Sequence, residues 1–392
     1  MGVMILVLLL CFEISCSQQI NMIEEEKRAL LHTKWWDFSH NFSGIYYNEF
    51  GSVIEISRPM ITPKDLRLAD LNFTAFPNLQ HLDLHEMGLI GMIPTQIGLL
   101  HSLISLDLSN NNLNGTIPTE IGALPNLTHL DLSYNKIIGT IPTQIGLLHS
   151  LISLNLSRNN LNGTIPTQIR RLDSLVYLDL SDNNLSGTIP PQMGALANLT
   201  VLDLSYNKII GTIPTQIGLL HSLISLNLSN NNLVGTIPPQ MGALANLTVL
   251  DLSYNKIIGP IPTQIGLLHS LDYLHLSNNN LNGTIPTQIG LLHSLISLNL
   301  SNNNLVGTIP PQMGALANLT VLDLSYNKII GTIPTQIALL HGLISLNLSN
   351  NNLGGTIPPQ MGALANLTVL DLSYNKIIEY VNPGKKLRGT HI

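Results

Sequence analysis

The sequence predicts an α/β solenoid, an elongated stack of repeats with a parallel β-sheet along its inner side. A stretch of 24 residues recurs, with twelve full copies over 79–366 and a truncated copy that begins at Leu367. A fixed period of this length is typical of solenoids. In each copy leucines alternate with polar residues, as in Leu106 and Leu108 around Asp107, which places the leucines on one side of a strand.

One repeat cannot bury its leucines alone, so neighbouring repeats must stack around a common core. We expect one strand per repeat, centred on 82–84, on 106–108 and on every equivalent triplet up to 370–372. The period also outweighs the length of 392 residues, which by itself would suggest two or three globular domains.

An asparagine follows each predicted strand at a fixed position of the repeat. The column runs from Asn111 to Asn375 at intervals of 24 residues, and only the first repeat departs from it, with Met87. A buried amide without partners would cost about 1–3 kcal/mol. We therefore expect each amide to turn inward and to bond the backbone of adjacent coils, which is a structural role.

Four segments are expected along the chain. They are a signal peptide at 1–17, an N-terminal cap with an irregular first repeat at 18–78, the repeats at 79–378 and a C-terminal tail at 379–392.

Residues 1–17 have most features of a secretory signal peptide, although no basic residue precedes the apolar run. Val3–Phe12 form an apolar run of ten residues, which is too short to span a bilayer. Ser15 and Ser17 suit a cleavage site that leaves Gln18 as the first mature residue. Both cysteines of the chain lie in this segment, so no disulfide is expected in the mature protein. The alternative is an uncleaved anchor.

The cap is expected to contain a helix over 22–36. Asn21 and Glu24 fit a capping box, and the glutamates from 24 to 26 suit the positive end of the helix dipole. One apolar stripe along this helix would consist of Leu31, Trp35 and Phe38. A solenoid needs such a cap, because its first repeat lacks a neighbour on one side. A short pair of strands and an irregular repeat are expected at 44–78.

After the asparagine each repeat continues as L/I-x-G-x-I-P, as in Leu113, Gly115, Ile117 and Pro118. Together with the preceding L-x-x-L-x-L-x-x-N, this pattern resembles the plant-specific leucine-rich repeats over about three quarters of the chain. The resemblance is closest to ectodomains of plant leucine-rich-repeat receptor-like kinases. It implies a right-handed superhelix whose inner sheet is followed by short outer strands and 3₁₀ turns, with a helical cap at the N-terminus.

Three features depart from that family. Similar caps carry a cysteine pair at the positions of His40 and Tyr47, so the cap disulfide is not expected. The tail at 379–392 does not resemble a C-terminal cap. No transmembrane run follows the repeats, and the glycine-rich loop, H-R-D and D-F-G motifs of kinases are absent from the sequence, so kinase activity is not implied.

Composition and motifs argue against other functions. The net charge is −6 and no long basic run occurs, so nucleic acid is not an expected partner. The pair His-Ser recurs on the outer turns, but no third group is placed to orient the histidine. The spacing of these histidines does not fit a zinc site, and we expect no catalytic activity, metal or cofactor. The His-Ser pairs start at His101, His149, His221, His269 and His293.

Solenoids commonly bind ligands on their concave inner face. Side chains that vary from repeat to repeat on the inner strands concentrate in repeats one to five and in repeat nine. Tyrosine and arginine are common in binding hot spots, so we expect a protein or peptide ligand there, with a co-receptor as a further partner. The candidate ligand-binding residues are Tyr134, Arg158, Tyr177, Asp179, Asp182 and Tyr206. No strand carries the Arg-x-Arg pair with which peptide receptors of the resembled family hold a carboxylate.

Fifteen N-x-S/T sequons suit a glycosylated extracellular protein. Four of them, at Asn155, Asn227, Asn299 and Asn347, lie on the predicted strands, where a glycan would obstruct the inner face. The full set consists of Asn41, Asn72, Asn114, Asn126, Asn155, Asn162, Asn184, Asn198, Asn227, Asn246, Asn282, Asn299, Asn318, Asn347 and Asn366.

The favoured function is ligand recognition and signal perception of the plant receptor type, either secreted to the apoplast or at the cell surface within a longer receptor. One alternative is a stand-alone secreted binder that resembles polygalacturonase-inhibiting defence proteins, although those usually carry cysteine-paired caps. A second alternative is a truncated receptor product without function, which the missing cap cysteines and the abrupt tail suggest. A catalytic function has the least support, so the protein is not expected to be an enzyme.

Overall fold

The computed structural model describes residues 23–33, 35, 44–57 and 66–378. These residues belong to two compact units, Met1–Asn184 and Leu185–Ile392, and each unit is described by itself. Several sequence-based predictions fall outside the described residues: the signal peptide, both cysteines, Asn21, His40, Phe38, the sequon at Asn41 and the tail.

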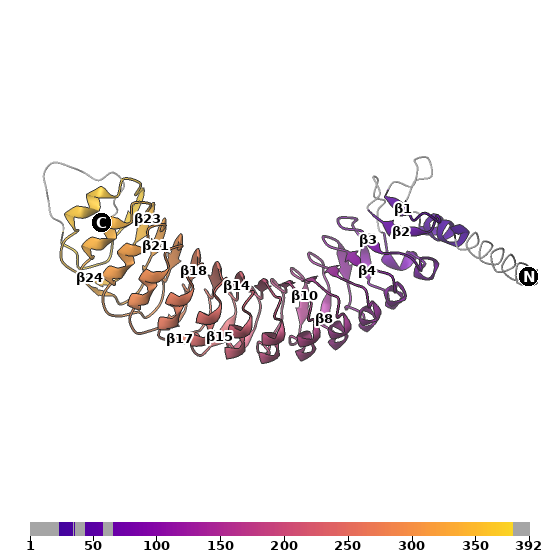
Figure 1. Ribbon diagram of the computed structural model, residues 1–392, viewed down its shortest axis with the longest axis horizontal. Helices are drawn as coiled ribbons and strands as arrows, with labels where there is room; N and C mark the ends of the chain where they lie inside the picture. The colour runs from indigo at the N-terminus through magenta and orange to yellow at the C-terminus, as the bar shows by residue number, and fades with distance from the viewer. Residues whose placement is uncertain (1–22, 34, 36–43, 58–65, 379–392) are drawn as a thin grey trace, which may run out of the picture. The chain divides into compact units, whose positions relative to one another are not determined.

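The first unit is built on a sheet of short strands, one from each repeat (Figure 1). It begins with an antiparallel hairpin of β1 (Ile45–Tyr47) and β2 (Val53–Ile56), as expected for the segment before the repeats. β2 then pairs in parallel with the first repeat strand, which attaches the cap to the edge of the sheet. The parallel strands that follow are β3 (His81–Asp83), β5 (Ser105–Asp107), β7 (His129–Asp131), β9 (Ser153–Asn155) and β11 (Tyr177–Asp179).

The second unit continues the same pattern of parallel strands, one from each repeat. Its central leucines are paired in register from strand to strand, as Leu226 is with Leu250. The strands are β12 (Val201–Asp203), β14 (Ser225–Asn227), β16 (Val249–Asp251), β18 (Tyr273–His275), β20 (Ser297–Asn299), β21 (Val321–Asp323), β23 (Ser345–Asn347) and β25 (Val369–Asp371).

One strand per repeat is confirmed, but each strand begins one residue earlier than predicted. The first repeat strand spans His81–Asp83 rather than 82–84. Leu84 N–H still donates to the Asp107 carbonyl of the next coil, at 2.8 Å. Hydrogen bonds between neighbouring coils therefore continue one residue past the end of the strand. The alternation of leucines does not reveal where the regular strand ends, because Leu84 continues it.

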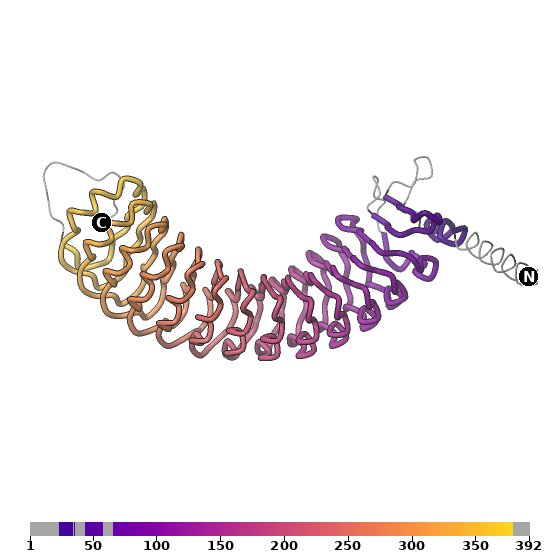
Figure 2. The backbone as a smooth tube through the Cα atoms, viewed as in Figure 1, coloured from indigo at the N-terminus to yellow at the C-terminus, as the bar shows by residue number. Residues whose placement is uncertain are grey.

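The opposite side of each coil is a 3₁₀ helix that follows the I-P dipeptide (Figure 2). Pro118, for example, is extended at φ −67° and ψ 144° and directly precedes Thr119–Ala123. In the first unit these helices are η3 (Thr95–Leu99), η4 (Thr119–Ala123), η5 (Thr143–Leu147) and η6 (Thr167–Arg171). In the second unit they are η7 (Pro191–Ala195), η8 (Thr215–Leu219), η9 (Pro239–Ala243), η10 (Thr263–Leu267), η11 (Thr287–Leu291), η12 (Pro311–Ala315), η13 (Thr335–Leu339) and η14 (Pro359–Ala363). Two shorter 3₁₀ helices, η1 (Leu68–Asp70) and η2 (Phe73–Ala75), lie before the first full repeat and follow Arg67 and Asn72 instead.

Neighbouring coils approach closely on this side. A Cβ at Gly146 would lie 2.5 Å from the Gln168 carbonyl oxygen of the next coil, so glycine is required by the close approach. Short second strands pair between the two sides, as the resemblance implied. The pairs are β4 (Ile90–Met92) with β6 (Asn112–Asn114), β8 (Ile138–Thr140) with β10 (Asn160–Asn162), β13 (Ile210–Thr212) with β15 (Asn232–Val234), β17 (Ile258–Gly259) with β19 (Asn280–Leu281), and β22 (Ile330–Gly331) with β24 (Asn352–Leu353).

The asparagine column forms a ladder of satisfied amides inside the coils. Asn135 Nδ2 donates to the Leu108 carbonyl of the preceding coil at 2.9 Å and to the Leu132 carbonyl of its own coil at 3.1 Å. Its Oδ1 accepts a hydrogen bond from Leu113 N–H of the preceding coil at 2.9 Å. The predicted structural role is confirmed, because each amide joins two coils through backbone groups that would otherwise be buried without partners.

The cap helix covers residues 23–33 among those described, and Trp35 lies outside it, although the predicted helix extended to residue 36. The buried face of the helix also differs from the predicted stripe. Trp35 is buried as expected, whereas Leu31 is 39% exposed and Leu30 is buried in its place. The buried face of the helix also contains Glu26, a residue type that a hydrophobic pattern excludes. The prediction of Leu31 was wrong because a buried glutamate rotates the helix face by one position.

No helix in the described ranges is long and apolar enough to cross a membrane.

Glu26 attaches the helix to the hairpin rather than serving only the helix dipole. Its Oε1 accepts a hydrogen bond from Ser52 Oγ at 2.6 Å, and its Oε2 accepts one from Val53 N–H at 3.1 Å. Burial raises the pKa of Glu26 above the ordinary 4.5, although both hydrogen bonds oppose the shift. The cap therefore depends on a carboxyl group whose charge is unfavourable at its buried position.

We predict that Asn231→Ala lowers the free energy of unfolding by about 1–3 kcal/mol, because it leaves buried backbone groups unpaired. Its amide bonds the Leu204 carbonyl and Ile209 N–H, each at 2.9 Å. The control is Asn230→Gly, since the Asn230 side chain bonds Ser229 Oγ and no buried backbone group, and glycine tolerates its φ of 54°. Urea unfolding followed by circular dichroism measures both variants, and equal losses would contradict the ladder.

The raised pKa of Glu26 predicts a pH dependence of stability. The contribution of this group is fully present below pH 4.5 and is lost as the pH rises through the folded-state pKa. We expect Glu26→Gln, which still accepts from Val53 N–H, to gain stability relative to the wild type between acid and neutral pH. Urea unfolding at several pH values, followed by the fluorescence of the tryptophans at 35 and 36, tests this. The exposed Glu25 provides the control Glu25→Gln, and the same pH response in that variant would refute the assignment.

Candidate functional site

Each repeat places one residue in a left-handed turn three positions after its long-sheet strand. Sequence reasoning placed this column on the inner strands, but Arg158, for example, lies beyond β9 with a φ of 53°. The frequent asparagines at this position of the repeat could have indicated the turn, because asparagine tolerates this conformation. We call these positions the left-handed row: Glu86, Asn110, Tyr134, Arg158, Asp182, Tyr206, Asn230, Tyr254, Asn278, Asn302, Tyr326, Asn350 and Tyr374.

Bulky side chains in this conformation carry strain. A residue with a Cβ loses about 1–2 kcal/mol in the left-handed region, and such strain is often found at functional sites. Tyr134 and Arg158 nevertheless occupy neighbouring positions of the row, where asparagine stands in many repeats. Their side chains are exposed, so burial does not explain the choice of residue.

Tyr134 and Arg158 contact each other across neighbouring coils. The Cζ atom of Arg158 lies 4.4 Å from the centroid of the Tyr134 ring. A cation–π contact at an exposed site contributes about 0.5–1 kcal/mol, and it holds two long side chains in a fixed arrangement. The pair thus presents a planar cation on an aromatic surface, just beyond the C-terminal ends of β7 and β9.

The next strand adds polar groups on the face of the sheet. Tyr177 Oη donates to Asp179 Oδ2 at 3.3 Å, and Asp179 Oδ1 accepts from Ser181 N–H at 2.9 Å. Asp182 is exposed in the left-handed row of the same coil. The predicted residues from Tyr134 to Asp182 therefore lie on three successive coils of the first unit. Tyr206 lies in the second unit, so it is considered apart from them.

The preceding coils carry aspartates on the same face, and one of them is electrostatically perturbed. Burial raises the pKa of Asp131, and the negative charge of Asp107 adds to the shift. Hydrogen bonds from Ser133 and Asn155 oppose it, and Asn155 Nδ2 lies 3.0 Å from Asp131 Oδ2. The sheet face next to the Tyr134–Arg158 pair is thus acidic and partly desolvated.

The strand sequons differ in how their amides are used. Asn155 Nδ2 donates to Asp131, and Asn227 Nδ2 donates to Asp203 at 3.2 Å. An N-linked glycan is attached to this same nitrogen, so a glycan at either site would substitute an amide that already holds the sheet face together.

The repeated His-Ser pairs do not bring a base to a nucleophile. His149 Nδ1 lies 3.1 Å from the Arg171 carbonyl oxygen of the next coil. Ser150 Oγ donates to the Pro125 carbonyl of the preceding coil at 3.1 Å. The two side chains bond opposite neighbours, which supports the structural role inferred from the sequence.

Comparison with known proteins places leucine-rich repeats along the two units. No curated protein matches the chain. The models "Leucine rich repeat" match residues 77–137, 269–329 and 317–377, the model "Leucine Rich repeats (2 copies)" matches 173–217, and the model "Leucine Rich Repeat" matches 150–172, 222–244 and 246–268.

Solved structures with this fold include plant receptors. The plant peptide hormone receptor RGFR1, in complex with RGF2, is 35% identical over 82% of this chain and 54% of its own, with a TM-score of 0.74. The Arabidopsis receptor kinase HAESA, in complex with the peptide hormone IDA and the co-receptor SERK1, is 33% identical over 82% and 61%, with a TM-score of 0.62. The chain thus spans between half and two thirds of these receptor chains.

A bacterial protein shares the fold over more of its length. The protein LIC12759 of Leptospira interrogans is 36% identical over 82% of this chain and 78% of its own, with a TM-score of 0.67. The similarity is therefore one between leucine-rich repeats in general, and it is not confined to plant receptors.

We predict that Tyr254→Asn raises the free energy of unfolding by up to about 1 kcal/mol, because asparagine relieves the left-handed strain. Tyr254 has a φ of 53° and is 56% exposed. Thermal unfolding compares it with Tyr273→Asn, whose tyrosine lies within strand β18 and where the change is expected to destabilise. A lower stability of Tyr254→Asn than of the wild type would show that the tyrosine ring compensates for its strain.

Proposed function

This chain belongs to the leucine-rich-repeat proteins, and from that premise we propose that it is an extracellular recognition module for a protein or peptide. The ligand would bind along the sheet face of the first unit, and the module would perceive a signal without chemistry of its own. The plant receptor ectodomains that it resembles include structures in complex with peptide hormones. That likeness supports a peptide as the ligand class and a co-receptor as a second partner.

The contact between Arg158 and Tyr134 is the observation that carries the proposed binding site. The guanidinium group lies over the ring at 4.4 Å, and the two residues remain exposed in a conformation that costs stability. Arginine and tyrosine are enriched in binding hot spots. A fixed, exposed cation on an aromatic ring offers a ligand both charge and contact area.

The surroundings of this pair define the chemistry of the proposed ligand. Arg158 would bind an acidic or carbonyl group, while Asp179 and Asp182 on the adjacent coil would accept hydrogen bonds from amides or a basic side chain. An extended peptide that crosses several coils would meet both kinds of group. The absence of an Arg-x-Arg strand argues that its carboxylate is not held by a pair of arginines.

Secretion and glycosylation belong to the same proposal. The signal-peptide features of residues 1–17 and the fifteen sequons support an apoplastic or cell-surface location. Sequons such as Asn114, Asn162 and Asn282 are exposed, where a glycan would leave the sheet face open. Enzymatic deglycosylation followed by mass spectrometry of tryptic peptides reports which sequons are occupied.

We predict that Arg158→Ala combined with Tyr177→Ala weakens ligand binding by about 2 kcal/mol or more, because both residue types act as hot spots. A randomised peptide library displayed on phage, selected on the secreted chain, supplies the ligand. Calorimetric titration of the selected peptide then compares the double variant with the wild type.

The matched control is Tyr254→Ala combined with Tyr326→Ala, which alters two exposed positions of the left-handed row in the second unit. Binding should be unchanged in this control. Undiminished binding by the first double variant, with loss in the control, would move the site to the second unit. Failure to select any peptide would argue against the peptide-binding function itself.

A further inference from the structure

Three aspartates face one another on adjacent strands at the start of the repeat sheet. Asp83 is the in-register partner of Asp107, and Asp107 is the partner of Asp131. Neighbouring strands lie about 4.8 Å apart, and like charges placed directly opposite each other destabilise a sheet. These three coils therefore concentrate negative charge along one line.

The second unit avoids such a run at the equivalent positions. There an amide or an imidazole always separates one aspartate from the next, in the order Asp203, Asn227, Asp251, His275, Asn299, Asp323, Asn347 and Asp371. In the first unit, Asn155 separates Asp131 from Asp179 and donates to Asp131. The uninterrupted acidic run is thus a feature of the first three repeats within these units.

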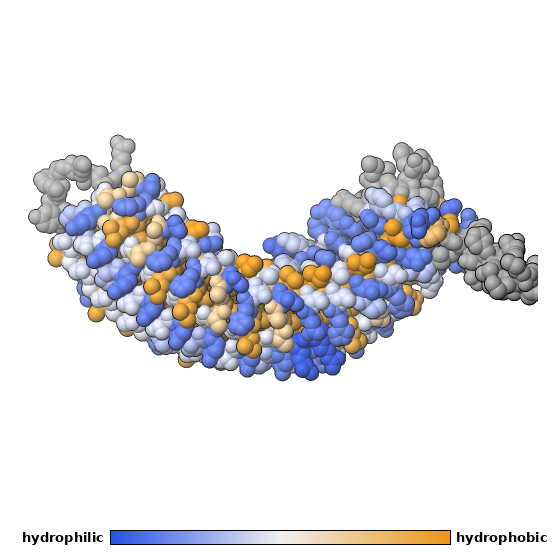
Figure 3. Space-filling view, viewed as in Figure 1, coloured by the Kyte–Doolittle hydropathy of each residue, from blue (hydrophilic) through white to orange (hydrophobic). Residues whose placement is uncertain are grey.

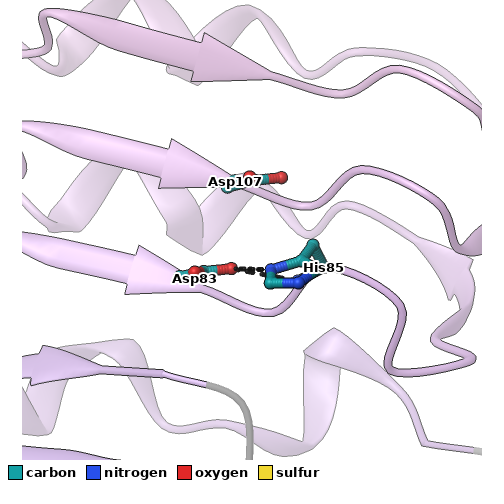
Figure 4. A group of neighbouring side chains, drawn as sticks. All are labelled: Asp83, His85 and Asp107. Atoms are coloured by element: carbon teal, nitrogen blue, oxygen red, sulfur yellow. Dashed lines mark hydrogen bonds and ion pairs between the residues drawn. The ribbon is translucent and has the colours of Figure 1, made fainter.

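The first repeat also replaces a serine with histidine. His85 stands where the other repeats have serine, whose hydroxyl donates to the residue two positions earlier, as Ser325 Oγ does to Asp323 at 2.6 Å. His85 Nδ1 lies 2.6 Å from Asp83 Oδ1 (Figure 4). The exchange keeps the contact with the aspartate and adds a ring that can bind a metal through either nitrogen.

These side chains converge from two coils. One ligand atom each from Asp83, His85 and Asp107 can be chosen so that all lie within 4.8 Å of one another, and all three residues are half-buried. Asp107 Oδ1 accepts from Ser109 N–H at 2.9 Å, which orients the carboxylate, and its Oδ2 accepts no hydrogen bond from the described residues. Metal–ligand bonds are about 2.0–2.2 Å long, so the three side chains would have to rearrange to place their ligand atoms around an ion.

We propose that Asp83, His85 and Asp107 bind one divalent transition-metal ion on the sheet face of the first unit. Two carboxylates and an imidazole are ligands that suit zinc and its neighbours in the first transition row. The ion would neutralise the repulsion between the paired aspartates, and water would complete its coordination. Spacing along the chain did not indicate this site, because its ligands come from two repeats.

Figure 3 shows hydrophobic and hydrophilic residues mixed over the visible side of the coils, and the three proposed ligands are only half-buried. Calorimetric titration of the purified full chain with zinc chloride is expected to show one ion per chain. His85→Ser restores the residue of the other repeats, so the fold should be kept while the affinity falls by about tenfold or more. Asp107→Asn should weaken binding to a similar extent.

His129→Ser is the matched control. His129 lies on strand β7 of the same sheet, and serine occupies the equivalent positions 105 and 153, so this variant should bind zinc like the wild type. Equal zinc affinity of His85→Ser and the wild type would overturn the proposal, as would no binding by the wild type at millimolar zinc. Calcium binding as tight as zinc binding, and unaffected by His85→Ser, would assign the effect to the acidic run alone. Circular dichroism establishes that each variant is folded.

Discussion

The bonds of the inward-facing asparagine amides to adjacent coils hold the repeats in place. After each strand the chain turns, and a backbone N–H such as that of Leu113 finds its acceptor only in the next coil, on Asn135 Oδ1. The same amide donates to carbonyls of two coils. Each repeat is therefore incomplete without its neighbour, which explains why stability in such proteins is a sum of units and interfaces.

The ladder also determines where variation is allowed. The leucines, the amides and the glycine at the close approach are fixed by contacts between coils, so the chain can vary chiefly at exposed positions of the sheet face and in the left-handed row. Tyr134 and Arg158 occupy that row at the cost of backbone strain. The proposed recognition residues thus lie at positions that are not fixed by contacts between coils.

Stacking identical repeats has opposite consequences for different side chains. A residue at a given position lies against its own counterpart in the next coil, about 4.8 Å away. Asparagine gains from this arrangement because it donates and accepts, whereas aspartate meets a like charge, as Asp83 and Asp107 do. The repulsion between aspartates can be relieved by a bound cation or by an amide that stands between them. Asn155 relieves it in the second way, because it donates a hydrogen bond to Asp131.

The sequence alone determined the solenoid, its period, one strand per repeat and the asparagine ladder, because these depend on a local pattern repeated at a fixed spacing. It also selected residues of the candidate site as exposed and varied. Only the tertiary structure decided that Leu30 rather than Leu31 is buried in the cap, since Glu26 bonds Ser52 on the hairpin. The same holds for the Tyr134–Arg158 contact and for the convergence of His85 with Asp107. Each of these joins residues at least 22 positions apart, and such distances are fixed by how coils stack and not by the pattern within one repeat.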